Sequence, residues 1–304
     1  MSTYVVGDIH GCYNEWITLK NKIESMDKDA RFILIGDIVD RGRQVMQMID
    51  WALHNVEPGG KYQMILGNHE DMKINWAKQY SKYKDVDFSK TQHFKHFDAD
   101  GYDFQYNLIA SDVTDDYVIK IIEFFKSLPL FIDLDVTTES GRNQYYVICH
   151  AALSNNVLDD NGRIDRTQCR ENHDSFNKVL DEYILWERNY WGNNWNYDTI
   201  VVHGHTPTCT RDLAVRGSNP GRIDFRRKDI NVDCGMCFGI EVSNLAAICL
   251  ETLDEYYAVD TEDCSLAAMS NSEAYKKDML HFIKTGHDIE EQSLDVEDTK
   301  IWSN

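Results

Sequence analysis

The sequence predicts a mixed α/β (α+β) protein with a metal site at one edge of a sheet. Five short apolar runs, each typical of a buried strand, lead directly into turns that carry Asp, His or Asn. Segments with apolar residues at helical spacing separate the first three runs. This alternation predicts a largely parallel half-sheet. Polar side chains that follow its strands can converge on one edge, where α/β folds place their sites.

The first half of the chain alternates strands and helices. The expected strands are 4–6, 32–35 and 64–66, and the expected helices are 13–25, 45–53 and 70–80. Pro58-Gly59-Gly60 ends the second helix. A further helix is expected at 115–126, where Val118, Ile121, Ile122 and Phe125 recur at helical spacing before Leu128-Pro129.

The second half is richer in strands. We expect them near 130–136 and 144–149, with a turn at Gly141, and then at 199–203, 229–233, 242–250 and 254–260. Residues 1–260 are therefore predicted to form one catalytic domain. Within it, residues 81–113 are polar and aromatic, and we interpret them as an insertion that folds over the edge of the site.

Residues 261–304 are predicted to form a helical and acidic tail. Its apolar stripe could dock a short helix on the core, through Tyr275, Met279, Phe282 and Ile283. The chain after Gly286 is acidic, and we expect it to be mobile.

Composition narrows the function classes. The net charge of −20 disfavours nucleic acid and anionic membranes as partners, because both need a cationic surface. No apolar stretch approaches the roughly 18 residues of a membrane helix, and no signal peptide is evident. Eight scattered cysteines indicate reduced thiols and a cytoplasmic protein rather than a disulfide framework. Cys234 and Cys237 have CxxC spacing, but a structural role is favoured over zinc or redox chemistry.

Six residues after the strands predict a site for two divalent metal ions: Asp8, His10, Asp37, Asn68, His150 and His205. Carboxylates, imidazoles and a carboxamide without a thiolate suit Mn²⁺, Fe or Zn²⁺. Asp37 lies centrally among the blocks and is the natural bridge. Asp8 and His10 would bind one ion, and Asn68, His150 and His205 the other. Asn68 adds no charge, so the site stays positive for a phosphate.

Four other residues are candidates for substrate chemistry. His69 is free to protonate a leaving oxygen, and Asp40 can hold its other ring nitrogen. Arg41 and Arg188 could contact phosphoryl oxygens, together with Asn68. Two of them have a structural alternative: a turn or helix cap for Asp40 and a surface ion pair for Arg188. His203 is not placed among the ligands. A basic cluster fits a solvated hairpin face better than a substrate rim: Arg211, Arg216, Arg222, Arg226, Arg227 and Lys228.

The blocks GDIHG, GDIVDRG, GNHE, CH and GHTP resemble the phosphoprotein phosphatase (PPP) family of calcineurin-like metallophosphoesterases, and bacterial and bacteriophage-type serine/threonine phosphatases most closely. The resemblance runs from Tyr4 to Leu250. It implies a central β-sandwich flanked by helices, with a dinuclear site on the loops of one edge. It also implies manganese as the usual metal and the ligand set above. Asp37 then bridges the two ions, His69 with Asp40 is the proton donor, and Arg41 and Arg188 contact phosphate.

The prediction is a serine/threonine phosphatase that acts on a phosphoprotein or a phosphorylated small molecule. A metal-bridging hydroxide would attack phosphorus while His69 protonates the leaving alcohol. The alternative is a symmetrical diadenosine-tetraphosphate hydrolase of the same family, because Leu66 stands where many phage-type relatives have Arg. An adenine-stacking aromatic would then lie in 81–113, for instance Phe94, Phe97, Tyr102 or Phe104. A third hypothesis is a regulatory module without strong activity. The sequence does not indicate an oligomeric state.

Overall fold

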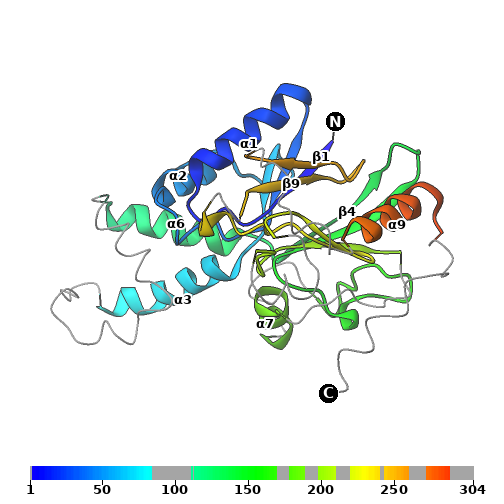
Figure 1. Ribbon diagram of the computed structural model, residues 1–304. Coiled ribbons are helices and arrows are strands. Elements are labelled where there is room, and N and C mark those ends of the chain that lie inside the picture. Colours follow the sequence, from blue (N-terminus) through cyan, green and yellow to red (C-terminus); the bar gives the residue numbers. More distant parts are fainter. Residues whose placement is uncertain are drawn as a thin grey trace, which may run out of the picture.

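Two five-stranded sheets form the centre of the molecule, with helices on their outer faces (Figure 1). The computed structural model describes residues 2–83, 111, 113–169, 178–188, 198–209, 220–239, 243–259 and 272–287. The expected α/β fold with a central sandwich is confirmed.

The first sheet has the strand order β10-β9-β1-β2-β3. Its strands are β1 (Thr3–Val6), β2 (Arg31–Leu34), β3 (Tyr62–Met64), β9 (Ala246–Cys249) and β10 (Glu255–Tyr257). β1, β2 and β3 are parallel, as the strand–helix alternation predicts, whereas β9 and β10 are antiparallel to their neighbours. The connecting helices are α1 (Tyr13–Met26) and α2 (Val45–Asn55).

The second sheet has the order β4-β5-β6-β8-β7. Its strands are β4 (Phe131–Thr137), β5 (Asn143–Cys149), β6 (Ile200–His203), β7 (Asp224–Arg226) and β8 (Asp229–Asn231). β5, β6 and β8 are parallel, and the two outer strands pair antiparallel with their neighbours. The turn expected at Gly141 joins β4 to β5, and Gly141 has a φ of 80° there.

Alternate residues of each strand enter different parts of the core, because side chains of a strand point to opposite faces. Val5 and Ile33 face Tyr146 and Val202 in the apolar layer between the sheets. Tyr4, Val6, Phe32 and Leu34 instead join a second apolar cluster with helix residues such as Trp16. Both faces of the first sheet are therefore buried, which explains why its strands are nearly all apolar.

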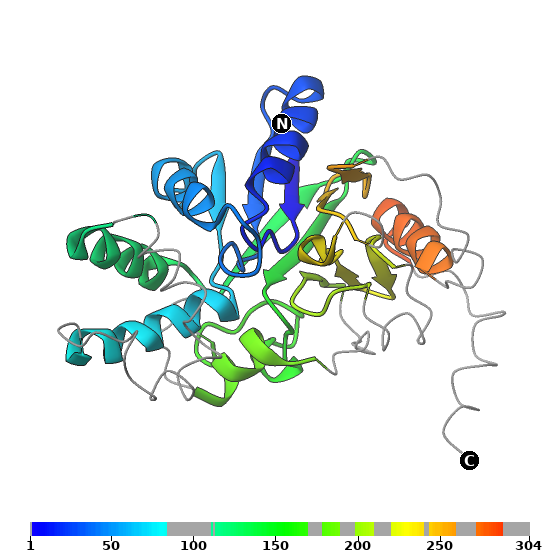
Figure 2. The same ribbon diagram turned by 60° about the vertical axis from the view of Figure 1, so that its left-hand side comes forward.

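Four more helices complete the described fold. They are α3 (Asn68–Tyr83), α6 (Asp115–Ser127), α7 (Lys178–Trp186) and α9 (Ser272–Thr285), with short 3₁₀ turns η2 (Asn155–Val157) and η3 (Met236–Phe238). α3 and α6 lie side by side and extend away from the sheets, while α7 lies opposite α1 and α2 (Figures 1 and 2). Thr114 caps α6 by accepting a hydrogen bond from Tyr117 N.

Several expected boundaries differ by a few residues, and β7 was not expected. The third strand was expected to continue to Leu66, but β3 ends at Met64, and α3 begins at Asn68 rather than at Glu70. Leu66 N donates to Pro129 O instead of to a neighbouring strand. The chain therefore leaves the sheet early and enters the helix through Asn68.

The predicted stripe of the tail lies on α9. Met279, Phe282 and Ile283 are buried and join the apolar cluster that includes the residues between the sheets, and Arg142 Nη1 donates to Phe282 O at 2.6 Å. The division of the chain at residue 260 stays a prediction. Most of the 81–113 segment, including Phe94, Phe97, Tyr102 and Phe104, lies outside the described residues, as does the chain after 287. Among the helices in the described parts, none is long and apolar enough to span a membrane.

Candidate active site

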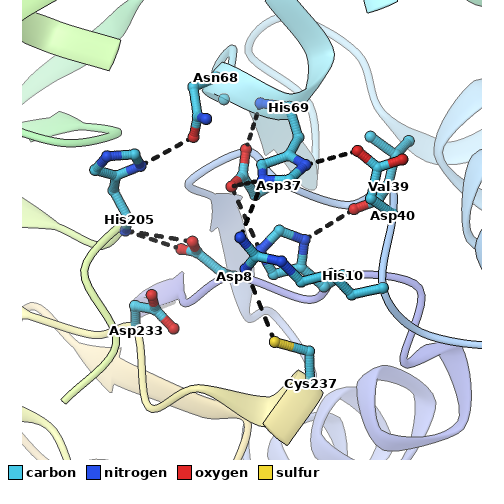
Figure 3. Close-up of polar contacts among 12 residues, drawn as sticks. Asp8, His10, Asp37, Val39, Asp40, Asn68, His69, His205, Asp233 and Cys237 are labelled. Carbon is cyan, nitrogen blue, oxygen red and sulfur yellow. Dashed lines mark hydrogen bonds and ion pairs between the residues drawn. The ribbon is translucent and has the colours of Figure 1, made fainter. Parts of the chain in front are cut away.

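All six predicted ligands lie just beyond the carboxyl ends of parallel strands, but the strands belong to both sheets. Asp8, Asp37 and Asn68 follow β1, β2 and β3 of the first sheet. His150 and His205 follow β5 and β6 of the second. Figure 3 shows Asn68 and His205 on one side of Asp37, and His10 and His69 on the other. The site thus sits where corresponding ends of the two sheets meet.

Residues with a positive φ angle are concentrated at the site. Of seven non-glycine residues with positive φ in the described chain, five belong to the predicted site: His10, Asp37, Asp40, Arg41 and His205. Their φ values of 45° to 66° lie in the left-handed region, which ordinary side chains adopt only at some cost in free energy. Surrounding contacts must hold these turns in place, so the strain is stored where the candidate ligands stand.

Two glycines allow the turns to approach each other. A Cβ on Gly67 would lie 2.3 Å from Asp37 N and 2.4 Å from Asp37 Oδ1. A Cβ on Gly204 would lie 2.4 Å from Asp8 Oδ1. Any side chain at either position would push a candidate ligand out of place.

The first metal-binding group, which we call the buried group, consists of Asp37, His150 and His205, with ligand atoms all within 4.8 Å of one another. Asn68 Oδ1 joins them, at 2.8 Å from His150 Nε2 and 2.9 Å from His205 Nδ1. His150 Nδ1 faces the carbonyl of Ile35 at 2.8 Å, which turns Nε2 toward the group. The structure therefore brings together the set predicted for one ion.

The electrostatics of the buried group suit a metal. Burial lowers the pKa of His205 to about 2, with help from His150 and Arg188, and burial also lowers the pKa of His150. Both imidazoles therefore stay neutral, as metal ligands must. His205 Nε2 is buried without a hydrogen-bond partner. The ring nitrogen available to a cation in this group is Nδ1, which faces Asn68 Oδ1.

The second group, which we call the charged group, consists of His10, Asp37 and His69, again with ligand atoms within 4.8 Å. His10 Nδ1 faces Val39 O at 2.8 Å, so Nε2 points to Asp37 Oδ2 at 3.5 Å. Burial lowers the pKa of His10 to about 3. Asp37 belongs to both groups, which is the position that a bridging ligand requires.

The prediction that Asp8 is a metal ligand stays a prediction. Asp8 is in neither of the two groups, and it accepts a hydrogen bond from His205 N at 3.3 Å. Burial, and the nearby carboxylates of Asp233 and Asp37, raise its pKa well above the usual range. These buried carboxylates repel one another, and a bound cation would offset the repulsion.

His69 and Asp40 form the pair that the sequence predicts. His69 Nδ1 lies 2.6 Å from Asp40 Oδ2, and the same oxygen lies 2.5 Å from Lys73 Nζ. Burial lowers the pKa of His69, but the Asp37 and Asp40 carboxylates outweigh it and raise the pKa overall. Proximity to Lys73 and His69 lowers the pKa of Asp40 despite its burial. His69 is thus favoured as an imidazolium, the state that a proton donor needs.

The two arginines lie at different groups. Arg41 Nη1 lies 2.6 Å from His10 Nε2, and Nη2 lies 3.2 Å from His69 Nε2. Arg188 Nη1 donates to His205 O at 3.2 Å. A cation on His10 Nε2 would displace the Arg41 contact and free that guanidinium for substrate. Each group therefore has one guanidinium beside it.

Glu70 is a site residue whose role the sequence did not reveal. It is fully buried, and its carboxylate accepts hydrogen bonds from Asp37 N, Ile38 N and Gly67 N at 2.7, 2.9 and 3.1 Å. Burial and the Asp37 charge raise its pKa to about 7. Glu70 thus ties together the turns that carry Asp37 and Asn68. Its place in the first turn of α3, directly after His69, is a signal that could have indicated this role.

Asp233 is the second such residue. It is 1% exposed, Oδ1 accepts from Gly235 N at 2.9 Å, and Oδ2 has no hydrogen-bond partner. Burial raises its pKa to about 6. Figure 3 shows it beside Asp8. Asp233 follows a parallel strand, β8, just as the predicted ligands follow theirs, so the same pattern could have identified it.

Other sequence candidates lie apart from this chemistry. His203 Nε2 pairs with Asp229 Oδ1 at 2.7 Å, both buried. In the β7–β8 hairpin, Arg226 pairs with Asp224, Lys228 lies over the Phe282 ring, and Arg222 lies over Tyr257. These cations have local structural partners. Arg211 and Arg216 lie outside the described residues.

Known proteins match this chain over most of its length. The family model for calcineurin-like phosphoesterases matches residues 1–233. The asymmetrical bis(5'-nucleosyl)-tetraphosphatase PrpE of Bacillus mycoides is 24% identical, over 82% of this chain and 92% of that protein. A symmetrical bis(5'-nucleosyl)-tetraphosphatase of Buchnera aphidicola is 27% identical, over 58% of this chain and 54% of that protein.

Solved structures align less closely. The cold-active protein-tyrosine phosphatase of a Shewanella species gives a TM-score of 0.49 at 16% identity, covering 85% of this chain and 80% of that one. Because this TM-score is below 0.5, the family is established by the match of the family model to residues 1–233. On that basis, the chain belongs to the calcineurin-like phosphoesterase family.

Proposed function

We propose that this protein is a metal-dependent hydrolase of dinucleoside polyphosphates. The main support for this proposal is the match, over about four fifths of the chain, to proteins named bis(5'-nucleosyl)-tetraphosphatases. The site supports it, because two metal-binding groups share Asp37 and each has a guanidinium at its side. Such an arrangement offers several positive contacts to an extended polyphosphate.

Two divalent ions in this site would supply Lewis-acid activation of the phosphoryl group and of water. The ligands Asp8, His10, Asp37, Asn68, His150 and His205 would hold them. Their oxygen and nitrogen donors fit manganese, which we propose as the metal, with iron or zinc as alternatives. Arg41 and Arg188 would orient the phosphoryl oxygens. His69 would give its proton to the oxygen that leaves, so that water is added across one P–O–P bond.

A protein serine/threonine phosphatase is the second candidate. The observation in its favour is the His69–Asp40–Lys73 chain, which maintains a protonated imidazole. An alkoxide is a poorer leaving group than a nucleotide phosphate, so a phosphoserine substrate depends more on a general acid. A polyphosphate substrate would therefore depend less on the general acid His69 than a phosphoserine substrate would.

A side-by-side assay tests both candidates. Manganese-loaded protein is incubated with diadenosine tetraphosphate and with a phosphoserine peptide, and products are separated by ion-exchange chromatography. Two ADP would indicate symmetrical cleavage, and ATP with AMP asymmetrical cleavage; either supports the proposal. Peptide turnover with kcat/KM above that for the dinucleotide would overturn it in favour of the second candidate. Asp37→Asn is the control for contaminating activity.

A further inference from the structure

Two of the exposed apolar side chains lie beside the candidate site. Among the described residues, four large apolar side chains are exposed: Met26, Ile119, Trp186 and Phe238. The first two are on α1 and α6. Trp186 lies two residues before Arg188, and Phe238 directly follows Cys237, whose Sγ contacts Arg41. Exposed aromatic surface is unfavourable in water, and its position beside phosphate-binding groups requires an explanation.

Trp186 lies at the buried group. Its side chain is 40% exposed, and its ring centroid is 6.2 Å from that of His205, with the planes nearly perpendicular. It ends α7, two residues before Arg188, whose guanidinium donates to His205 O. An indole face and a phosphate-binding guanidinium therefore stand together at this side of the site.

Phe238 lies in the short turn that contacts Arg41 through Cys237. Its side chain is 56% exposed, and it follows Cys237, whose Sγ accepts a hydrogen bond from Arg41 Nη1 at 3.8 Å (Figure 3). Gly235, with a φ of 72°, begins the 3₁₀ turn, and a Cβ there would lie 3.2 Å from Phe238 Cδ2. The turn thus holds an exposed phenyl ring next to the residue that contacts Arg41.

We propose that Trp186 and Phe238 are stacking platforms for the two nucleobases of a dinucleoside polyphosphate. This inference rests on the proposed function and adds the residues that recognise the nucleosides. A phosphate chain bound by Arg41 and Arg188 would carry one base toward each aromatic ring. A ligand for this surface needs anionic and aromatic parts together, which a nucleotide has. The earlier expectation placed the stacking residue in 81–113, so these rings are a different recognition element.

Stacking also sets the expected base preference. Every nucleobase has a π face, so stacking without hydrogen bonds to base edges discriminates little among bases. We expect the adenine and guanine forms of the dinucleoside tetraphosphate to have KM values within a few-fold of each other.

The test measures affinity and turnover separately. Trp186→Ala and Phe238→Ala are each expected to raise KM for diadenosine tetraphosphate about 10-fold, the typical loss of one stacked base. Trp186→Phe should recover most of the affinity, because it retains an aromatic face. Ile119→Ala, which removes an exposed apolar side chain from α6, is the matched control and should match wild type.

Calorimetry of manganese-loaded protein with ADP and with inorganic phosphate separates this proposal from the proposed function. The platforms predict that ADP binds more tightly than phosphate, and that the alanine variants lose this preference while retaining phosphate binding. The ADP preference is expected even if the wild type fails to cleave the dinucleotide. Failure of cleavage would overturn the proposed function but not the stacking platforms. Equal wild-type affinity for ADP and phosphate, an unchanged preference in both alanine variants, or an equal loss of both ligands would overturn the platforms.

Discussion

The two metal-binding groups share Asp37 but differ in what surrounds them. The buried group places neutral imidazoles and a carboxamide around Asp37, and His150 is fully buried. The charged group instead has ionic neighbours, with Arg41 on its imidazoles and Asp40 and Lys73 behind His69. His69 there is partly exposed.

In the proposed function, this difference would separate metal binding from proton transfer. Burial keeps the imidazoles of the buried group neutral and available to a metal. In the charged group, carboxylates raise the pKa of the His69 imidazole, whereas burial lowers the pKa of its neighbour His10. A ligand and an acid can thus stand side by side because their electrostatic surroundings differ.

The most severe test removes the residue that the groups share. Asp37→Asn is expected to lose both metal ions, because Asp37 is the carboxylate that both groups share. The fall in kcat should exceed the ~10²–10³-fold cost of losing one electrostatic contact. Metal content measured by mass spectrometry, alongside kcat, checks this. Two retained ions per chain would show that Asp37 does not bridge.

The next largest effect should be confined to the charged group. His69→Asn is expected to lower kcat by about 10²–10⁴-fold for a substrate with a poor leaving group. Metal content should stay at the wild-type level, and a substrate with a good leaving group should lose much less activity. A near wild-type rate on an alkyl phosphate would show that another group is the acid.

The ion pair behind the acid should affect stability more than chemistry. Lys73→Met leaves the Asp40 carboxylate without its buried cation, which typically costs about 3–5 kcal/mol of unfolding free energy. We expect a fall in kcat of about 10–100-fold, as for other residues that orient a site residue. Denaturant unfolding and kcat are both measured. Lys78→Met, at an exposed position on the same helix, is the control; equal effects of the two changes would remove Lys73 from the site.

The smallest effect concerns the pH dependence of metal binding. The pKa values of His10 and His205 are about 3 and about 2, so their protons do not compete with a metal above pH 5. Carboxyls with raised pKa values do compete, namely Asp8 and Asp233. Manganese affinity should therefore rise from pH 5 to 7.5, by about 10-fold for displacing the proton of a carboxyl whose pKa is about 6, as for Asp233.

Calorimetry in buffers of different ionisation enthalpy counts the protons released in that experiment. Asp233→Asn should flatten the pH dependence because it removes one titrating carboxyl. An affinity that does not change with pH in the wild type would contradict the role given to these carboxyls.

Local patterns were sufficient to predict most strands and most helices, and to select candidate site residues that the structure brings close together. The β1–α1–β2–α2–β3 order follows from apolar periodicity, and the carboxyl ends of parallel strands necessarily share an edge. The pair formed by His69 and Asp40 was also predicted, because a histidine beside a ligand needs a partner for its other nitrogen. These features depend on interactions close in sequence or on general rules of sheet topology.

Sequence alone determined the family, the α/β fold class and the set of residues available for metal and phosphate. Tertiary structure decided which of them meet: Asp8 beside Asp233, Glu70 under the Asp37 turn, and Lys73 against Asp40. Only tertiary structure placed Trp186 and Phe238 near the same site from distant segments. Contacts between residues far apart in sequence leave no periodic signal. They depend on how the two sheets pack, and so they appear only in the folded chain.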